Sequence, residues 1–385
     1  MSFHAGEVII YQAMLGGEGG GADLTMHLRH FSVFESLKKP YVSFQAQLID
    51  MVDLADRFNG TNYLTISFGQ PGQDPYTKTF VITSVQRNHN ARNLREQELE
   101  IVGYSPQMTA FPKIQRSYKN IPLSEVVTDL VNTYLQPLVV PFRVDAPSRG
   151  ICGSDRMPYC LNGVQLHKAL RQTMLRSVST MDESSAYVLF ENNKALVLDT
   201  LVNLQNKAVA GDRTYYQLPM GTDFLRDVAR QNKVILSMLE ESRIDKTQIV
   251  QADDIESRPF DVFANRFQGI SIGDGAASTY QNIPYNMLRP PTFLANALPQ
   301  RKRAAAAFDQ QSITIQVALY PAVTVGEGFA AVTLKPSSVI GDGAEPPTVE
   351  RTYLATEVRH TVDLTTRRMT GTTTAKGVLG DLSVF

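Results

Sequence analysis

Three segments near the start of the chain recur, in the same order, in its second half. The matched pairs are Phe31–Ser36 with Leu236–Glu241, Val42–Leu48 with Ile313–Leu319, and Thr79–Val85 with Thr352–Val358. Seven of the 20 aligned residues are identical, and most of the others exchange one apolar residue for another or Ser for Thr. Such exchanges keep each side chain on its own face of a strand, because side chains alternate with a period of two. The repeat predicts two copies of one β-sheet module.

The first copy has the pattern of antiparallel strands joined by turns. Strands are predicted at 24–35, 42–49, 64–68, 80–87 and 98–104, after a short strand at 7–14. Lys39-Pro40 and Asn59-Gly60 between them are typical turn residues. Apolar and polar residues alternate along 42–48, so one face is buried and the other is solvated. We therefore expect a small barrel or sandwich, preceded by a glycine-rich arm at 16–21.

The middle of the chain changes to a helical period. A helix is predicted from Ile121, with Pro122 in its first turn, and a second from about 164 to 177, with Asn162 as its N-cap. A strand pair at 186–191 and 195–201 follows. Helices beside a hairpin indicate a compact α+β domain between the two β modules.

The second copy carries an insertion that the first lacks. The insertion is rich in Pro and Gly and has no long periodic run, so we expect short strands and loops. Its one charge cluster, Arg301-Lys302-Arg303, is interpreted as a solvated face. The predicted fold is α+β, mainly β, with two antiparallel β-barrels, a small α+β domain and a loop-rich insertion. The expected division is 1–116 for the first barrel with its arm, 117–205 for the α+β domain, 206–245 with 308–385 for the second barrel, and 246–307 for the insertion.

Composition excludes several classes of protein. Lys and Arg number 37 against 38 Asp and Glu, which leaves a formal charge of −1 and disfavours nonspecific nucleic-acid binding. We expect a soluble protein without membrane insertion that begins in the cytoplasm, because no apolar run approaches a membrane span and Met1 is not followed by a signal-peptide pattern. Cys152 and Cys160 are interpreted as reduced thiols, with a local bridge as the alternative.

Catalytic motifs are poorly represented. Gly17-x-Gly19-x-x-Ala22, with Glu35 downstream, loosely fits a dinucleotide fingerprint, but a strand follows where a helix is required, so a linker is favoured. The six histidines are scattered, and His27 and His30 would point to opposite faces of one strand. The histidines are His4, His27, His30, His89, His167 and His360.

The acidic motifs are equally weak. Asp182-Glu183 and Asp253-Asp254 lie in turn-like contexts that favour surface solvation over acid–base chemistry. Gly341-Asp342-Gly343 lacks the spaced carboxylates of a calcium loop. The sequence therefore predicts no catalytic, cofactor-binding or metal-binding residue, and a protein that is not an enzyme.

Several segments resemble the central baseplate hub proteins of tailed bacteriophages. They are Phe34-Glu35-Ser36-Leu37-x-x-Pro40-Tyr41, Asp50, Leu64–Phe68, Glu98–Ser105, Ile114–Tyr118 before a Ser-Glu-Val-Val helix, Tyr187–Glu191, Val325-Gly326-Glu327-Gly328 and Tyr353–His360. The resemblance covers about residues 23–377. Similar barrels form the hub part of type VI secretion spike proteins.

The resemblance implies two tail-tube-like barrels per chain in a homotrimer, so that three chains present six similar barrels to a hexameric tail tube and keep threefold symmetry for a trimeric spike. The implied function is a structural virion protein that joins tube to spike and helps nucleate tail assembly. Implied partners are the tail tube protein, a separate spike protein, and tape measure and baseplate wedge proteins, with DNA only in transit through the lumen. The implied location is the tail baseplate of a virion assembled in the bacterial cytoplasm.

Departures from the family and other classes leave alternatives open. The chain ends soon after the second copy, so we expect the spike to be a separate polypeptide. A hub of a type VI-like or other contractile injection system is one alternative. A β-barrel that binds nucleic acid and a sugar-acting β enzyme are alternatives from other classes.

Overall fold

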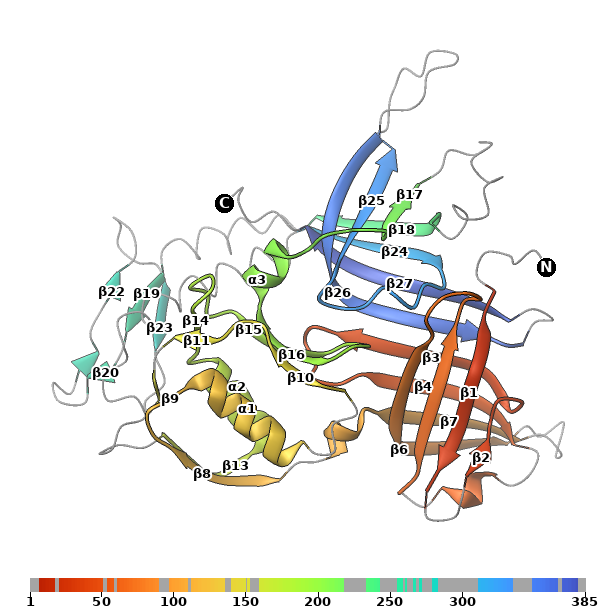
Figure 1. Cartoon of the computed structure of the whole chain (residues 1–385), viewed down its shortest axis with the longest axis horizontal. Coiled ribbons are helices and arrows are strands. Elements are labelled where there is room, and N and C mark those ends of the chain that lie inside the picture. Colours follow the sequence, from red (N-terminus) through yellow and green to blue (C-terminus); the bar gives the residue numbers. More distant parts are fainter. Residues whose placement is uncertain are drawn as a thin grey trace, which may run out of the picture.

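The computed structural model places most of the residues that it describes in strands (Figure 1). It describes residues 7–17, 21–50, 54–58, 61–89, 97–109, 112–135, 140–149, 151–152, 159–217, 233–242, 255–258, 260–261, 266–267, 270–271, 279–282, 311–334, 348–365 and 369–379. The predicted α+β fold, mainly β and antiparallel, is confirmed. None of the helices in these ranges is long and apolar enough to cross a membrane.

The first module is an antiparallel sheet in the order β3-β4-β7-β6-β5-β1-β2. Alternating apolar residues such as Phe44, Ala46 and Leu48 fill its core, together with Phe31, Ile66 and other fully buried side chains. Its elements are β1 (Ile9–Gly16), β2 (Ala22–Asp23), β3 (Leu28–Ser36), β4 (Ser43–Asp50), β5 (Tyr63–Gly69), β6 (Tyr76–His89) and β7 (Gln97–Tyr104), with 3-10 turns η1 (Leu54–Arg57) and η2 (Pro106–Thr109).

The second module has the same strand order, β18-β24-β27-β26-β25, with β17 beside β25. Ile313, Ile315 and Phe329 lie in its separate core. One difference is the last strand, because β17 runs parallel to β25 while β1 runs antiparallel to β5. The strands are β17 (Thr214–Tyr216), β18 (Ile235–Ser242), β24 (Gln311–Ala318), β25 (Gly328–Leu334), β26 (Thr348–Asp363) and β27 (Thr370–Leu379).

Strand register confirms the duplication. Ser32 pairs with Gln45 in the first module, and their sequence equivalents Ser237 and Gln316 pair in the second. A register shift falls between Ile82 and Ser84 of β6 and at the equivalent place in β26, between residues 355 and 357. A bulge of this kind adds one residue and bends the strand. The two copies therefore share detailed geometry as well as order.

The modules are joined edge to edge by the long strand β26. Residues 348–354 of β26 pair with β25, and residues 357–363 pair with β3 of the first module. The joint produces one 13-stranded sheet among the described residues, and that sheet does not close into barrels. The first module ends in the hairpin β1–β2, in which Met14 pairs with Asp23. In the second module Tyr216 of β17 forms an isolated bridge with Val234, just before β18.

The middle of the chain forms a smaller α+β unit with its own core, which includes Val126, Leu130 and Leu198. The strand pair β15–β16 confirms the predicted hairpin. The elements are β8 (Lys113–Tyr118), β9 (Ile121–Pro122), α1 (Leu123–Tyr134), β10 (Phe142–Val144), β11 (Ser148–Arg149), β12 (Ile151–Cys152), β13 (Tyr159–Gln165), α2 (Leu166–Met174), β14 (Val178–Ser179), β15 (Tyr187–Glu191), β16 (Leu196–Thr200) and α3 (Leu201–Asn206).

Both predicted helices are present, but one predicted cap is wrong. The predicted start of α1 at Ile121, with Pro122 in the first turn, is two residues too early, because Ile121 and Pro122 form β9 and Pro122 is the N-cap of a helix that begins at Leu123. Asn162 does not cap α2, because β13 pairs with β8 as far as Gln165, which is the N-cap. The short helix α3 was not predicted, although Thr200 accepts a hydrogen bond from the Asn203 amide as its N-cap.

The described residues of the insertion are short strands, as predicted. They are β19 (Ile255–Arg258), β20 (Phe260–Asp261), β21 (Arg266–Phe267), β22 (Ile270–Ser271) and β23 (Thr279–Asn282). In Figure 1 these teal strands lie at the left, beside the α+β unit and away from the large sheet.

Candidate functional site

The residues of the loose dinucleotide fingerprint have other roles. Gly17 follows β1, Ala22 lies in β2, and the two strands pair as a hairpin, so a strand follows this segment where a dinucleotide fingerprint requires a helix. Glu35 is fully buried in β3. Gly19 lies outside the described residues. The favoured interpretation as a linker between strands agrees with this arrangement.

Histidines and acidic pairs make structural contacts. His27 Nδ1 lies 3.0 Å from the carbonyl oxygen of Ile49, and no group of three potential metal ligands occurs among the described residues. Asp182 accepts hydrogen bonds from the Ser184 amide and the Thr200 hydroxyl, and Glu183 pairs with Arg149 at 2.9 Å. These carboxylates stabilise a turn rather than meet in a cleft.

Several predicted features cannot be placed. Asp253-Asp254, Arg301-Lys302-Arg303 and Gly341-Asp342-Gly343 lie outside the described residues, as does His4. Cys160 is an exposed free thiol, which agrees with the interpretation of reduced cysteines, and the side chain of Cys152 is not described.

A buried ion pair connects the first module to the α+β unit. Lys78 Nζ of β6 lies 2.8 Å from Glu191 Oε1 of β15, and both side chains are fully buried. Lys78 also donates to the carbonyl oxygen of Asn192 at 2.6 Å, while Glu191 accepts from the Val42 amide and from Gln107. Because a buried charge is stable only when it is paired and hydrogen-bonded, this contact fixes how the two units pack.

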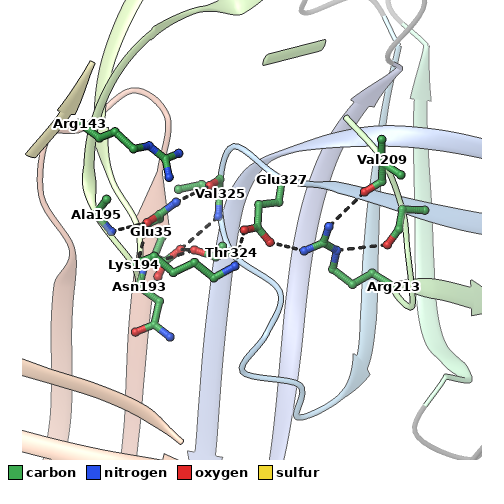
Figure 2. A network of polar contacts seen from close by, with 12 residues as sticks. Glu35, Arg143, Asn193, Lys194, Ala195, Val209, Arg213, Thr324, Val325 and Glu327 are labelled. Carbon is green, nitrogen blue, oxygen red and sulfur yellow. Dashed lines mark hydrogen bonds and ion pairs between the residues drawn. The ribbon is translucent and has the colours of Figure 1, made fainter. Parts of the chain in front are cut away.

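Glu35 makes the corresponding connection to the second module. Its carboxylate accepts hydrogen bonds from the Tyr76 hydroxyl at 2.9 Å, the Val325 amide at 3.1 Å and the Thr324 hydroxyl. Burial raises the pKa of Glu35, and Lys78 and the three hydrogen bonds oppose that rise. The loop before β25 is thereby held against β3 and β6 (Figure 2).

A partly solvated group of ion pairs lies at the other side of that loop. Figure 2 shows Glu327 between Lys194 of the α+β unit and Arg213 of the segment before β17. Lys194 Nζ is 2.5 Å from Glu327, and Arg213 also pairs with Glu327 and donates to the carbonyl oxygen of Val209. These partly solvated pairs orient the surfaces but contribute little free energy.

Sequence reasoning missed the buried polar residues, although a signal was present. Tyr76, Lys78 and Phe80 alternate with polar threonines, so the period of two puts Lys78 on the buried face. Phe31, Val33 and Glu35 follow the same rule. A charged residue in phase with buried neighbours indicates a buried polar contact.

One cavity of about 520 Å³ lies between the turn after β3 and helix α2. Its apolar lining includes Leu37, Leu170 and Met174, and Lys38 and Arg171 lie at its margin. The described lining also includes His167, a possible base, but no Asp, Glu, Ser or Cys beside it.

The solvent face of the large sheet is polar and carries charges of both signs, among them Glu100, Arg359 and Lys376. Gln45 donates to Glu100 at 2.6 Å, and Ser237 donates to Gln316 at 3.1 Å, so side chains are hydrogen-bonded across strands. The uncharged residues on this face include Ser43, Gln45, Gln47, Thr314, Gln316, Thr372 and Thr374. Such a face is wetted by water without attracting one sign of charge.

Comparison with known proteins identifies the fold. No family model and no curated protein sequence matches the chain. A tail protein from Neisseria meningitidis has a similar structure, with a TM-score of 0.57 at 13% identity over 97% of this chain and 96% of that one. The 43 kDa tail protein of prophage MuSo2 from Shewanella oneidensis gives 0.55 at 10% identity over 96% and 98%.

A third similar structure comes from a secretion system. An Escherichia coli component of the type VI secretion system, described as structurally similar to two tail proteins of bacteriophage T4, gives a TM-score of 0.50 at 12% identity over 97% of this chain and 76% of that one. The chain thus has the fold of these phage tail proteins and of this type VI secretion component, as the resemblance in its sequence implies.

Proposed function

We propose that this protein is a trimeric baseplate hub that adapts a hexameric tail tube to a trimeric central spike. The observation that carries the proposal is the duplicated module: one chain holds the same five-strand order twice, in register and joined edge to edge. Three such chains supply six similar modules around one axis while the assembly keeps threefold symmetry.

In this role the protein is a structural, non-enzymatic virion component at the tail tip. Its partners are the tail tube protein, a separate spike polypeptide, and tape measure and baseplate wedge proteins, and assembly takes place in the bacterial cytoplasm. DNA passes through the lumen without being bound, which the absence of a cationic excess on the described sheet face supports. We assign residues 1–116 to the first module, 117–205 to the α+β unit, 206–245 with 308–385 to the second module, and 246–307 to the insertion. The strand β8 crosses the first of these boundaries and packs in the α+β unit.

The likeness to the type VI component favours one second candidate, a hub of a type VI-like or other contractile injection system. That role uses the same proposed ring of six modules from three chains. The two candidates differ in the tube and spike proteins that co-purify with the hub.

Mass measurement and imaging test the proposal. We expect trimers by light scattering coupled to gel filtration, and rings by negative-stain microscopy, when the protein is mixed with its tube and spike proteins. A strict monomer without rings in the presence of both partners contradicts the hub function. A monomer in their absence is compatible with trimerisation on assembly.

A further inference from the structure

The cavity between the first module and the α+β unit has no part in the proposed hub function. Its volume of about 520 Å³ falls within the range of pockets that hold small molecules. The turn after β3 supplies Leu37, Lys38 and Pro40 on one side, and α2 and β15 supply most of the other. Both sides belong to one chain, so a single copy carries the whole cavity.

The buried part of this cavity is apolar. Leu166, Leu170 and Leu189 line it and are all buried. Tyr187 also lines it, but its hydroxyl already donates a hydrogen bond to the carbonyl oxygen of Ala146. Such a lining favours a hydrocarbon chain, because the transfer of apolar surface out of water lowers the free energy.

One buried polar side chain in the lining decides which way round a ligand lies. Gln107 is 4% exposed and donates from Nε2 to Glu191, while its Oε1 has no hydrogen-bond partner among the described residues. An unpaired carbonyl oxygen repels an anion, and a buried charge without a partner is costly. The charged end of an anionic ligand therefore lies at the mouth of the cavity and not inside it.

The mouth of the cavity is cationic. Lys38 from the turn and His167 and Arg171 from α2 line it with exposed side chains. His167 and Arg171 are four residues apart and so lie on one face of the helix. The described lining contains no Asp or Glu, and no described carboxylate forms an ion pair with Lys38 or Arg171. An apolar interior behind a cationic mouth complements a ligand with a hydrocarbon body and one negative charge.

We infer that this cavity binds an aliphatic chain that ends in an anionic group, with the chain inside and the anion held by Arg171 and Lys38. Arg171 suits a carboxylate in particular, because a planar guanidinium donates two parallel hydrogen bonds to it. The bound chain contacts the first module and the α+β unit together, as the Lys78–Glu191 pair does. The inference does not rest on the hub function.

Titration calorimetry of the whole protein with dodecanoate, below its micelle concentration, tests the site. We expect one molecule bound per chain. Dodecyltrimethylammonium has the same chain with a positive head, and it should bind at least about tenfold more weakly, because it forms no charge-assisted hydrogen bond at the mouth. Equal affinities for the two compounds, or no binding of dodecanoate, overturn the inference.

Charge reversal separates the mouth from the rest of the surface. Arg171→Glu with Lys38→Glu should lower the affinity for dodecanoate by at least about tenfold and raise that for dodecyltrimethylammonium. The matched control is Lys168→Glu with Lys119→Glu, which changes the net charge equally at exposed residues outside the lining. Equal losses of affinity in the two variants, or a loss in neither, overturn the inference.

A third variant keeps the test valid if charge reversal unfolds the protein. Met174→Trp reduces the volume of the cavity without changing its charge, and it should abolish dodecanoate binding, whereas undiminished binding contradicts the site. Flotation with phosphatidylglycerol vesicles distinguishes two sources of the chain. Flotation that dodecanoate abolishes assigns the ligand to a membrane lipid, and dodecanoate binding without flotation assigns it to a free fatty acid.

Discussion

Lys78 and Glu191 illustrate why a sheet protein keeps charge in its interior. Both side chains are fully buried, in separate units of the chain, and each has further hydrogen-bond partners. Apolar residues of similar volume stabilise such a position as well or better, but they accept many packing geometries. We interpret the pair as a device that selects one orientation of the α+β unit on the first module.

Removing one partner of that pair should be costly. Lys78→Met leaves Glu191 charged and buried, and we expect the free energy of unfolding to fall by about 3–5 kcal/mol. Lys194→Met is the matched control, because Lys194 is 61% exposed in its pair with Glu327 and should lose at most about 1 kcal/mol. Urea titrations measure both values, and equal small losses would show that the burial is not maintained in solution.

His360 should make stability depend on pH. It is fully buried between Tyr76 and Phe68, with Nδ1 3.0 Å from Thr373 Oγ1, and burial lowers its pKa from 6.5 to about 4. Between these values the unfolded chain binds the proton and the folded chain does not. Stability therefore falls as pH drops from 6.5 towards 4, by roughly 3 kcal/mol at about 1.4 kcal/mol per pKa unit.

The measurement is the pH dependence of the free energy of unfolding for the natural protein and His360→Gln. Glu35 acts in the opposite direction, because its raised pKa makes the fold bind a proton more tightly than the unfolded chain above pH 4.5. The difference between the two proteins isolates His360. Parallel curves from pH 4 to 6.5 would exclude it as the source of the slope.

At the level of elements, patterns with a local period were predictable and contacts between distant strands were not. The stripe that includes Val126, Leu130 and Val131 predicted α1, because every third or fourth residue faces the core. The repeat predicted equivalent strands in register. No local pattern marks the pairing of β26 with β3, since each strand alternates in the same way whichever neighbour it has.

A substitution at Gly377 tests how closely the chain packs opposite the bulge of β26. Gly103 and Gly377 lie opposite the register shifts of β6 and β26. A Cβ on Gly377 would lie 2.6 Å from the ring of Phe329 and 2.7 Å from Tyr353 Cβ, so Gly377→Ala should destabilise by about 1–3 kcal/mol. Gly21→Ala is the control, because its nearest neighbour would be 3.6 Å away. Similar melting temperatures for the two variants would contradict the packing described.

At the scale of the whole molecule, positive and negative side chains are mixed over the solvent face of the large sheet rather than separated at opposite ends. The face carries Gln and Thr together with charges of both signs, and Lys376 lies opposite Glu357 and 3.9 Å from Glu241. Because affinity for DNA grows with the number of phosphates contacted by Lys and Arg, such a surface holds DNA weakly.

We therefore expect no retention of duplex DNA in gel-shift assays at about 50 mM salt, where electrostatic binding is strong. A variant with Gln45→Arg, Gln316→Arg and Thr374→Lys should bind DNA, with an affinity that falls steeply as salt rises. Binding by the natural protein at low salt would favour the nucleic-acid-binding alternative, and a variant that fails to bind would show that this face is not accessible.

The β26–β3 joint changes the molecularity of assembly. If six identical modules had to meet, every contact in the ring would depend on concentration. In the proposed ring of three chains, half of the equivalent contacts form within a chain, at an effective concentration fixed by its own length. The proposed ring then assembles from three particles instead of six, and species with one, three or five modules do not occur on the pathway.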